Sequence, residues 1–464
     1  MMMCRSLCQL IVSGLILSSS SIVSSDARAQ LTIGRQIIEP VNPIIDKVPV
    51  DVGTVRDVLE NQVEQGVDST FETLTNIPAP QFTVPSPLSL TSPAGNLVLK
   101  EVKAPDGFLA VKSEWLVVGS EADKTHFSHP DITIESSHYL TAIDQWVYRL
   151  KVSANLDELS QIRNNLPTSL KEQVGRNHIY LAQNMGELQS PETYEIPENP
   201  APLENQKNSQ DKQASIATTG KPKVCQVPVR IGMIDTNIAH NHQTLKHLVI
   251  EQQSFLPQAL PTTQLHGTSV ASLLADNMLT GSHLYNASVF YTRNSISQGA
   301  TLLSLIDGLN YLVAKHVDAI NMSLAGPENS VLANVIKKIS EQGIQIIAAV
   351  GNEGPASPPL FPAAYPSTIA VTAVDSKQAI YRWANQGNYV DFAASGVSVE
   401  VAHPDGTISR ETGTSMATPF VSARYACLFR ASSNQAQALA TLRDQAIDAG
   451  APGRDPVFGV GILQ

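Results

Sequence analysis

Short apolar runs alternate with amphipathic segments through the C-terminal half of the chain. The runs are bounded by turn-forming residues and lie at 229–234, 317–322, 344–350 and 369–374. Apolar residues recur at the spacing of a helix face in the intervening segments, 302–315 and 331–342. Strands that are apolar at every position are typical of a parallel sheet, because helices bury both of its faces. The pattern therefore predicts an α/β domain over residues 223–464, with a mainly parallel central sheet between layers of helices.

A smaller folded unit is predicted N-terminal to this domain, over residues 107–183. Strands are indicated at 115–118, 131–143, 146–152 and 177–181. A helix is indicated by the spacing of four apolar residues, Leu156, Leu159, Ile162 and Leu166. This mixture predicts a small α+β unit.

Two further segments lack this periodicity. Residues 30–106 contain several prolines and predict a leader or spacer, with a short helix at 55–67. Residues 184–222 are rich in Pro, Gln, Asn, Ser and Lys and predict a linker. Linkers between folded units are preferred sites of proteolysis, so we expect processing within 184–222.

Residues 1–29 predict a secretory signal peptide. Arg5 supplies the positive charge, an apolar run follows at 7–17, and Ala-Arg-Ala at 27–29 is a small-x-small cleavage site. An uncleaved membrane anchor is the alternative, but the run is well short of the ~20 residues that span a bilayer. The sequence has no other apolar segment of that length. We therefore expect a secreted or periplasmic protein.

Composition excludes some classes of function. A net charge of −11 argues against nucleic-acid binding, because no basic stripe is available to neutralise phosphates. Charged residues are only 16% of the chain, which argues against a charge-expanded disordered protein. With 464 residues and 42% hydrophobic composition, the chain can bury at least one large core.

Four polar residues stand in short, distinctive motifs. Asp235 ends an apolar run, His266 precedes Gly-Thr, Asn352 lies in Gly-Asn-Glu-Gly, and Ser415 lies in Gly-Thr-Ser-Met-Ala-Thr-Pro. Each alone can be a turn former or a helix cap. Together they supply what nucleophilic acyl transfer needs: a hydroxyl, a base, a carboxylate that orients the base, and a donor for the oxyanion.

These motifs resemble the subtilases, the subtilisin-like serine peptidases, over residues 225–464. The resemblance implies a three-layer subtilisin-like fold and hydrolysis of peptide bonds through an acyl-enzyme. It implies a catalytic triad of Asp235, His266 and Ser415. The oxyanion would be bound by the Asn352 side chain and the Ser415 N–H group.

The resemblance also implies a specificity pocket, which would be formed by Ser323, Leu324, Ala325, Gly326, Glu353, Phe361 and Ala363. Ala325 and Ala363 stand at positions that are often Gly in the family, which would make the pocket shallower. We therefore expect a preference for small or medium apolar side chains over Trp or Tyr.

The sequence departs from the family pattern at several positions. Asn237, Ser269 and Ser272 replace a Gly, a second His and a Gly, and we expect altered packing with catalysis retained. The chain between His266 and Val289 looks shorter than in calcium-binding relatives, and segment 276–282 lacks an evident set of oxygen ligands. No cofactor is therefore predicted, with calcium as the alternative. A metal site at His240, His242 and His247 is a weaker alternative, because no Cys or carboxylate lies nearby in sequence.

Two cysteines remain after removal of residues 1–29. Cys225 lies ten residues before Asp235, and Cys427 lies twelve residues after Ser415. A helix that begins at Ser415 would carry Cys427 ~18 Å from the active end, toward the start of the strand that ends in Asp235. Export permits a disulfide, and the alternative is two buried free thiols.

The α+β unit resembles, less specifically, the inhibitory prodomains of subtilases. Its closing strand, at 177–180, is similar to the strand that enters the active site in such prodomains. The resemblance implies a zymogen whose prodomain is an intramolecular inhibitor. An unrelated accessory domain is the alternative.

Two other functions stay open beside hydrolysis of proteins or peptides. A catalytically silent binding module is disfavoured, because all four catalytic positions are filled. A peptide ligase or macrocyclase would use the same residues but transfer the acyl group to an amine instead of water. Product mass separates these reactions, since hydrolysis adds water.

Overall fold

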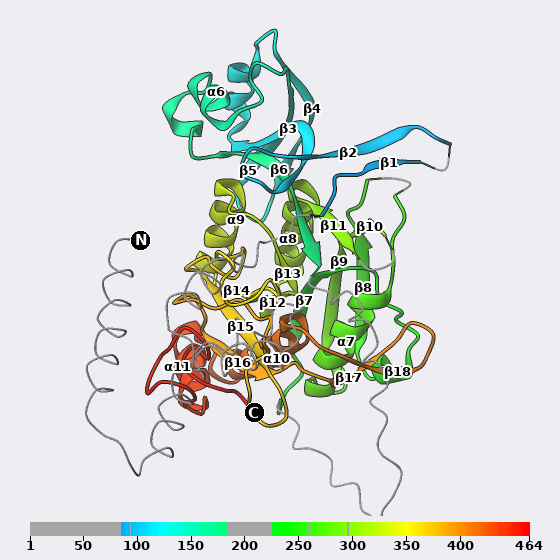
Figure 1. Ribbon diagram of the computed structural model, residues 1–464, viewed down its shortest axis with the longest axis vertical. Helices are drawn as coiled ribbons and strands as arrows, with labels where there is room; N and C mark the ends of the chain where they lie inside the picture. Colours follow the sequence, from blue (N-terminus) through cyan, green and yellow to red (C-terminus); the bar gives the residue numbers. More distant parts are fainter. Residues whose placement is uncertain (1–84, 93, 183–224, 258–259, 295–296) are drawn as a thin grey trace, which may run out of the picture. The chain divides into compact units, whose positions relative to one another are not determined.

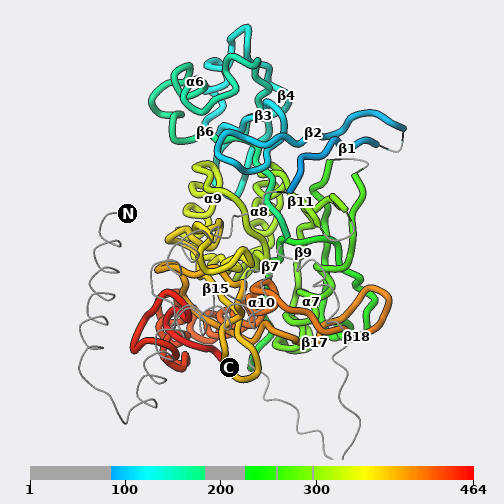
Figure 2. The backbone as a smooth tube through the Cα atoms, in the orientation of Figure 1, coloured from blue at the N-terminus to red at the C-terminus, as the bar shows by residue number. Residues whose placement is uncertain are grey.

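A computed structural model describes residues 85–92, 94–182, 225–257, 260–294 and 297–464 of the chain. The predicted signal peptide (1–29), the predicted helix at 55–67 and the predicted linker (184–222) lie outside the described residues. Figure 1 shows the elements and Figure 2 the path of the backbone.

A seven-stranded sheet forms the centre of the C-terminal domain. In order across the sheet, its strands are β16 (Phe392–Ser395), β15 (Thr368–Val374), β14 (Gln345–Ala349), β12 (Ala319–Met322), β7 (Arg230–Asp235), β9 (His283–Ser288) and β8 (Val249–Ser254). All neighbouring pairs are parallel. The four apolar runs of the sequence correspond to β7, β12, β14 and β15, which confirms the predicted parallel sheet. Strand β8 was not predicted, because it is polar and largely exposed and carries no apolar run.

Helices cover both faces of this sheet (Figure 1). They are α7 (Leu265–Asn277), α8 (Leu302–Ala314), α9 (Ser330–Glu341), α10 (Thr414–Ser432) and α11 (Gln435–Asp444). Helix α8 packs with α9, and α10 packs with α7 and α11. The Thr301 hydroxyl caps α8 by accepting from Ser304 N, and the Asn329 side chain caps α9 by accepting from Val331 N. A further antiparallel pair, β17 (Val399–Ala402) and β18 (Ile408–Glu411), lies against α7.

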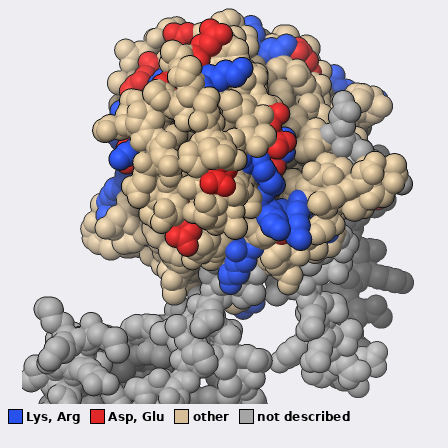
Figure 3. All heavy atoms as spheres, turned by 90° about the horizontal axis from the view of Figure 1, so that it is seen from above, with Lys and Arg blue, Asp and Glu red and all other residues tan. Residues whose placement is uncertain are grey.

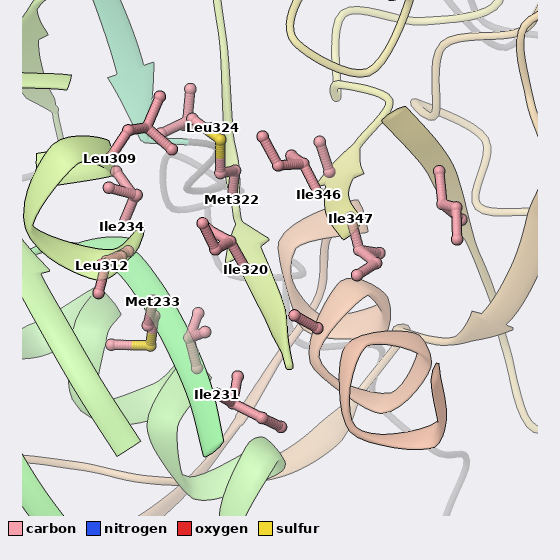
Figure 4. Packing of buried hydrophobic residues seen from close by; sticks show 14 of the residues in the cluster. Ile231, Met233, Ile234, Leu309, Leu312, Ile320, Met322, Leu324, Ile346 and Ile347 are labelled. Atoms are coloured by element: carbon pink, nitrogen blue, oxygen red, sulfur yellow. The ribbon is translucent and has the colours of Figure 1, made fainter. Parts of the chain in front are cut away.

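Apolar side chains from the sheet and from α8 pack together in the core. Figure 4 shows Ile231 and Met233 of β7, Ile320 of β12 and Leu309 and Leu312 of α8 among them, and all of these are fully buried. Burial of a side chain of this size stabilises the fold by about 1.5–3 kcal/mol before the entropy cost of ordering it.

Cys225 and Cys427 form a disulfide bond, with their Cα atoms 5.1 Å apart. Cys427 lies on α10, and Cys225 precedes β7. The bond therefore joins residues that are 202 positions apart in the sequence.

The N-terminal described region is an α+β unit built on antiparallel strands. Its elements are β1 (Ser89–Thr91), β2 (Leu97–Lys103), β3 (Leu109–Gly119), a 3-10 turn (Glu121–Phe127), β4 (Ile132–Leu140), β5 (Gln145–Val152), α6 (Leu159–Asn164), a second 3-10 turn (Thr168–Leu170) and β6 (Val174–Ala182). A separate core formed around Trp115, Tyr148, Leu150 and Ile162 stabilises this unit.

Two details differ from the sequence-based prediction. Strands β1 and β2 lie within the predicted spacer 30–106, so the folded unit begins earlier than residue 107. Strand β2 pairs with β3, and its Glu101 binds Arg293 of the C-terminal domain. Both partners are distant in the sequence, so the local hydrophobic pattern does not predict these strands. Helix α6 is shorter than the predicted span, since Leu156 and Leu166 are buried but lie outside the helix.

Strand β6 joins the α+β unit to the C-terminal domain. It is antiparallel to β3 over its first residues, and at Leu181 it lies between β11 (Gln298–Thr301) and β13 (Leu324–Ala325) of the C-terminal domain, antiparallel to both. Strand β10 (Tyr291–Thr292) continues the sheet beyond β11. Figures 1 and 2 show β6 running from the α+β unit toward these strands.

Acidic and basic side chains are both scattered among uncharged residues on the face shown in Figure 3. Within the described residues, no helix has both the length and the apolar character that a membrane span requires.

Candidate active site

Asp235 and His266 form a buried pair. Asp235 ends β7, His266 lies in the first turn of α7, and neither side chain is exposed. The Asp235 Oδ1 atom lies 2.7 Å from His266 Nδ1. Gly267 permits this close approach, because a Cβ atom there would lie 2.6 Å from the carbonyl oxygen of Asn237. The Gly in the His-Gly-Thr motif thus has a packing role.

The pKa of His266 is raised above its usual value of 6.5. Burial alone would lower the pKa, since it disfavours the imidazolium. The charge of Asp235 and its hydrogen bond to the ring favour the imidazolium and outweigh burial, with a smaller contribution from the charge of Glu411. The pair therefore holds a proton more readily than an isolated imidazole does.

The other ring nitrogen, His266 Nε2, is buried and makes no hydrogen bond within the described part of the chain. The structure thus brings Asp235 and His266 into direct contact, whereas no hydrogen bond joins His266 to Ser415. Contacts between a base and a nucleophile are often loose before substrate binds.

Ser415 lies in the first turn of α10 and is fully buried. Its Oγ atom lies 3.3 Å from the Ser323 carbonyl oxygen, and the Ser323 hydroxyl donates to the Ser415 carbonyl at 3.1 Å. The backbone N–H groups of a first helical turn have no intrahelical acceptor, and the helix dipole favours negative charge there. Ser415 therefore combines a hydroxyl with a nearby environment suited to an anion.

Asn352 follows β14, and its side chain points toward the same helix end. Its Oδ1 atom accepts hydrogen bonds from the backbone N–H and the hydroxyl of Thr414, both at 3.0 Å. With the oxygen engaged in this way, the amide Nδ2 is the donating end of the side chain. Asn352 and the N-terminus of α10 are therefore oriented together by Thr414.

Glu411 is a site residue that sequence reasoning missed. It lies on β18, and its Oε1 atom accepts a 2.9 Å hydrogen bond from the hydroxyl of Ser269, which lies one helical turn after His266. Its charge contributes to the raised pKa of His266. No motif surrounds Glu411 in the sequence, and only the β17–β18 hairpin brings it to α7.

Of the seven residues predicted to form a specificity pocket, Ser323 contacts Ser415, and the other six divide into three groups. Leu324 and Ala325 form β13 and pair with β6. Gly326 and Phe361 exchange two backbone hydrogen bonds of 2.9 and 3.0 Å. Ala363, two residues after Phe361, is buried. Glu353 N donates to Asn385 Oδ1 at 2.8 Å, and burial raises the pKa of the Glu353 carboxyl group.

Strand β6 lies along this set of residues. The Tyr180 hydroxyl donates to the Pro327 carbonyl at 3.0 Å. The Tyr180 ring covers Gly326 so closely that a Cβ atom there would lie 2.4 Å from Tyr180 Cδ1. A larger residue at position 326 would displace the strand.

A backbone N–H at the start of α8 and two side chains at the start of α9 bind other residues of β6. Asn177 Oδ1 accepts from Leu303 N at 3.1 Å, at the first turn of α8. Asn329 Nδ2 donates to the Arg176 carbonyl, and the Ser330 hydroxyl donates to the Val174 carbonyl, both at 3.0 Å. The N-termini of α8 and α9 thus bind β6 through two of its backbone carbonyl groups and the side-chain amide of Asn177.

Two of the three histidines considered as metal ligands, His242 and His247, have protein partners. His242 Nδ1 accepts from Thr244, and His247 Nε2 lies 3.0 Å from the Ala275 carbonyl oxygen. Within the described residues, no group of three or more His, Cys, Asp or Glu side chains is arranged to hold a metal ion.

Comparison with known proteins identifies the family of this domain. Residues 228–461, just over half of the chain, match the subtilase family (peptidase S8). A subtilisin of Bacillus pumilus is 37% identical over 204 residues, which are 42% of this chain and 74% of that protein. The minor extracellular protease Epr of Bacillus subtilis strain 168 is 31% identical over 206 residues, which are 43% of this chain and only 32% of Epr.

Among solved structures, the prenylagaramide maturation protease PagA is similar to 53% of this chain and 92% of its own, at 23% identity and a TM-score of 0.43. The family match and the subtilisin relatives assign the C-terminal domain. The chain belongs to the subtilase family, and its C-terminal domain is that of a serine-type endopeptidase.

Proposed function

We propose that this chain is an exported serine endopeptidase that is made as a zymogen and matured by its own active site. The Ser415 hydroxyl attacks the carbonyl carbon of a peptide bond, and His266 accepts the hydroxyl proton and returns it to the leaving amine. Water then hydrolyses the acyl-enzyme by the same route. The observation that carries the proposal is the buried 2.7 Å contact between Asp235 and His266 Nδ1, which orients Nε2 as the base.

The oxyanion formed in each step would be stabilised by Asn352 Nδ2 and by the N–H group of Ser415. Thr414 supports this role, because it fixes the Asn352 oxygen and so directs the amide nitrogen away from itself. Preorganised donors of this kind are most effective where water is excluded. No metal or cofactor takes part in the proposed steps.

Strand β6 would act as the inhibitory segment of a prodomain. It occupies the backbone hydrogen bonds of both β11 and β13, which an extended substrate would otherwise form. Its register pairs Ala182 with Leu324, which directly follows Ser323 in the sequence. Because the Ser323 carbonyl oxygen lies 3.3 Å from Ser415 Oγ, we propose self-cleavage one residue beyond Ala182, between residues 183 and 184.

A disulfide and the sequence of residues 1–29 support export. Disulfides persist in oxidising compartments, and Cys225 and Cys427 are bonded. We therefore propose that the protein acts outside the cytoplasm, in the periplasm or the medium.

The first test uses the chain without residues 1–29, beside Ser415→Ala and the exposed-site control Ser376→Ala. Intact mass is followed over time, with casein present as a substrate in a parallel series. The wild-type chain and the control should lose a fragment that ends near residue 183 and should cut casein. Ser415→Ala should do neither. If Ser415→Ala behaves like wild type, the catalytic assignment is wrong, and the binding-module alternative becomes the better one.

Product mass decides between hydrolysis and ligation. Peptides that carry a free amino group are incubated with the matured enzyme, and the products are weighed. Hydrolysis gives two fragments whose masses sum to the substrate plus water. A linked or cyclic product without added water would identify a ligase instead.

A peptide panel tests the proposed preference for small or medium apolar residues directly before the scissile bond. The argument is that Ala325 and Ala363 fill space that Gly would leave open. The panel varies only that residue, and kcat/KM is compared. If Trp or Tyr peptides are cleaved fastest, the shallow-pocket hypothesis is wrong.

A further inference from the structure

Arg293 is a buried cation beside the groove that holds β6. It directly follows β10 in the C-terminal domain, and only 1% of its side chain is exposed. Its guanidinium makes a two-point contact with Glu101 of β2, through Nε to Oε1 at 2.9 Å and Nη2 to Oε2 at 2.7 Å. Paired contacts of this kind match the planar guanidinium to a carboxylate.

Tyr291 completes this arrangement. Its hydroxyl donates to Glu101 Oε1 at 2.7 Å, so one carboxylate binds two side chains of the C-terminal domain. Glu101 itself is fully buried. Charges are buried in this way only when they are paired and hydrogen-bonded, so this is a site built for a carboxylate.

The carboxylate in this site belongs to the α+β unit, not to the C-terminal domain. The other described contacts of the guanidinium are with the Ser86 carbonyl at 2.8 Å and the Ser297 hydroxyl at 3.2 Å. Of these partners, only Ser297 lies in the C-terminal domain. If the α+β unit is released, Arg293 and Tyr291 lose their carboxylate and become accessible.

The site lies next to a residue of the strand that mimics substrate. Gly299 of β11 pairs with Tyr291 on one side and with Leu181 of β6 on the other. Directly opposed residues in an antiparallel sheet point to the same face. Leu181 accordingly packs against the apolar cluster that contains Tyr291.

Gly299 has no side chain, so none separates Leu181 of β6 from Arg293 and Tyr291. A Cβ atom at position 299 would lie 2.9 Å from Arg293 Cδ and from the Tyr291 hydroxyl oxygen. These side chains therefore lie directly over the glycine. A longer side chain at the Leu181 position would extend across Gly299 toward the guanidinium.

We propose that Arg293 and Tyr291 form a carboxylate-binding subsite that selects substrates with an acidic residue at the position that pairs with Gly299. In the zymogen, Glu101 occupies this subsite in place of the substrate carboxylate. This inference rests on the proposed function, because it requires β6 to be released and replaced by a substrate strand. With cleavage after residue 183, the selected residue is the third before the scissile bond.

The test uses the full chain after self-maturation. The substrates are internally quenched fluorescent peptides that carry residues 176–188 of this sequence. Three peptides have Leu, Gln or Glu at position 181, and kcat/KM is measured for each. The Glu peptide should exceed the Gln peptide by about tenfold or more, since hydrogen bonds to a charged partner are the stronger ones. The advantage should shrink as salt is added.

Three variants test whether the preference depends on these two side chains. Arg293→Gln should bring the ratio of kcat/KM for the Glu and Gln peptides near one, and Tyr291→Phe should reduce this ratio by a smaller factor. Arg293→Lys keeps the charge without the two-point geometry, and should retain a reduced preference.

Equal rates for the Glu and Gln peptides in the wild-type enzyme would overturn the inference, even if the Arg293 variants fail to fold. A preference that survives in Arg293→Gln would also overturn it, and Arg293 would then serve only to retain the α+β unit. If the Leu peptide is not cleaved either, the proposed function fails and this inference fails with it.

Discussion

The proposed catalytic centre and the groove that holds β6 are assembled in opposite ways. Asp235 and His266 meet through a single side-chain contact in a fully buried position, and the proposed catalysis depends on the identity of both residues. Strand β6 is held mainly by backbone pairing with β11 and β13, in which residue identity matters little. Specific side chains matter at a few contacts only, such as the Tyr180 ring against Gly326 and the Glu101 carboxylate against Arg293.

This contrast has a consequence for mutation. A substitution in the catalytic centre should reduce turnover by orders of magnitude without changing which segment occupies the groove. A substitution in the groove should change inhibition or selectivity and leave turnover of a small substrate intact. The following predictions test this separation, from the largest expected effect to the smallest.

The largest effect is expected for Asp235→Asn. The amide cannot stabilise the imidazolium and favours the wrong tautomer of His266, so kcat should fall by about 10⁴. Pre-steady-state and steady-state cleavage of a short peptide by the matured enzyme measure this loss. A reduction of less than about tenfold would show that Asp235 does not orient the base.

A smaller loss is expected for Asn352→Asp. The variant keeps an oxygen to accept from Thr414 but replaces the amide donor with a second, negatively charged oxygen. Loss of one oxyanion donor reduces kcat by about 10²–10³, with KM little changed. Asn352→Leu should show a similar loss. If KM rises while kcat is unchanged, Asn352 binds substrate and does not stabilise the oxyanion.

In the groove, Tyr180→Ala should weaken the proposed inhibition by the α+β unit. It removes a hydrogen bond to Pro327 and the ring that packs over Gly326. Replacing a buried aromatic residue by Ala typically destabilises a structure by about 3–5 kcal/mol. Because the Tyr180 ring lies at the contact with Gly326, the cleaved α+β unit should dissociate at least tenfold faster, and activity should appear correspondingly sooner. The final specific activity should equal that of wild type, and a change in that value would contradict the separation.

The smallest effect is expected for Glu411→Gln, measured as the pH dependence of kcat/KM. The base must be neutral to accept a proton, and the raised pKa of His266 places the acid limb of the profile above the usual 6.5. Removing the Glu411 charge lowers the pKa of His266, so the acid limb should move to lower pH. The control is Glu400→Gln on the neighbouring strand β17, where the carboxylate pairs with Arg410 at the surface. A shift to higher pH, or an equal shift in the control, would contradict the assignment.

Local sequence was sufficient for the parts of the molecule whose pattern is continuous. The runs that form β7, β12, β14 and β15 are apolar because both faces of these strands are buried. Nearly every residue in these runs is therefore apolar, and the pattern can be recognised without knowing the fold. The polar residues at the ends of β7 and β14 could be predicted for the same reason, since each interrupts an apolar run. The motif around Ser415 was recognised through its resemblance to the subtilase family, since by itself a Ser at a helix start can be a simple cap.

Tertiary structure decided the features that depend on distant partners. Strands β1 and β2 have no strong pattern of their own, and they form because Glu101 binds Arg293 and because β3 supplies hydrogen bonds. Glu411 reaches Ser269 only through the β17–β18 hairpin, and the disulfide between Cys225 and Cys427 was one of two outcomes that the sequence allowed. The sequence by itself determined the chemistry available to this protein, because side-chain types and local periodicity are local properties. The fold decided which groups meet, because a hydrogen bond or an ion pair forms only between atoms a few ångströms apart.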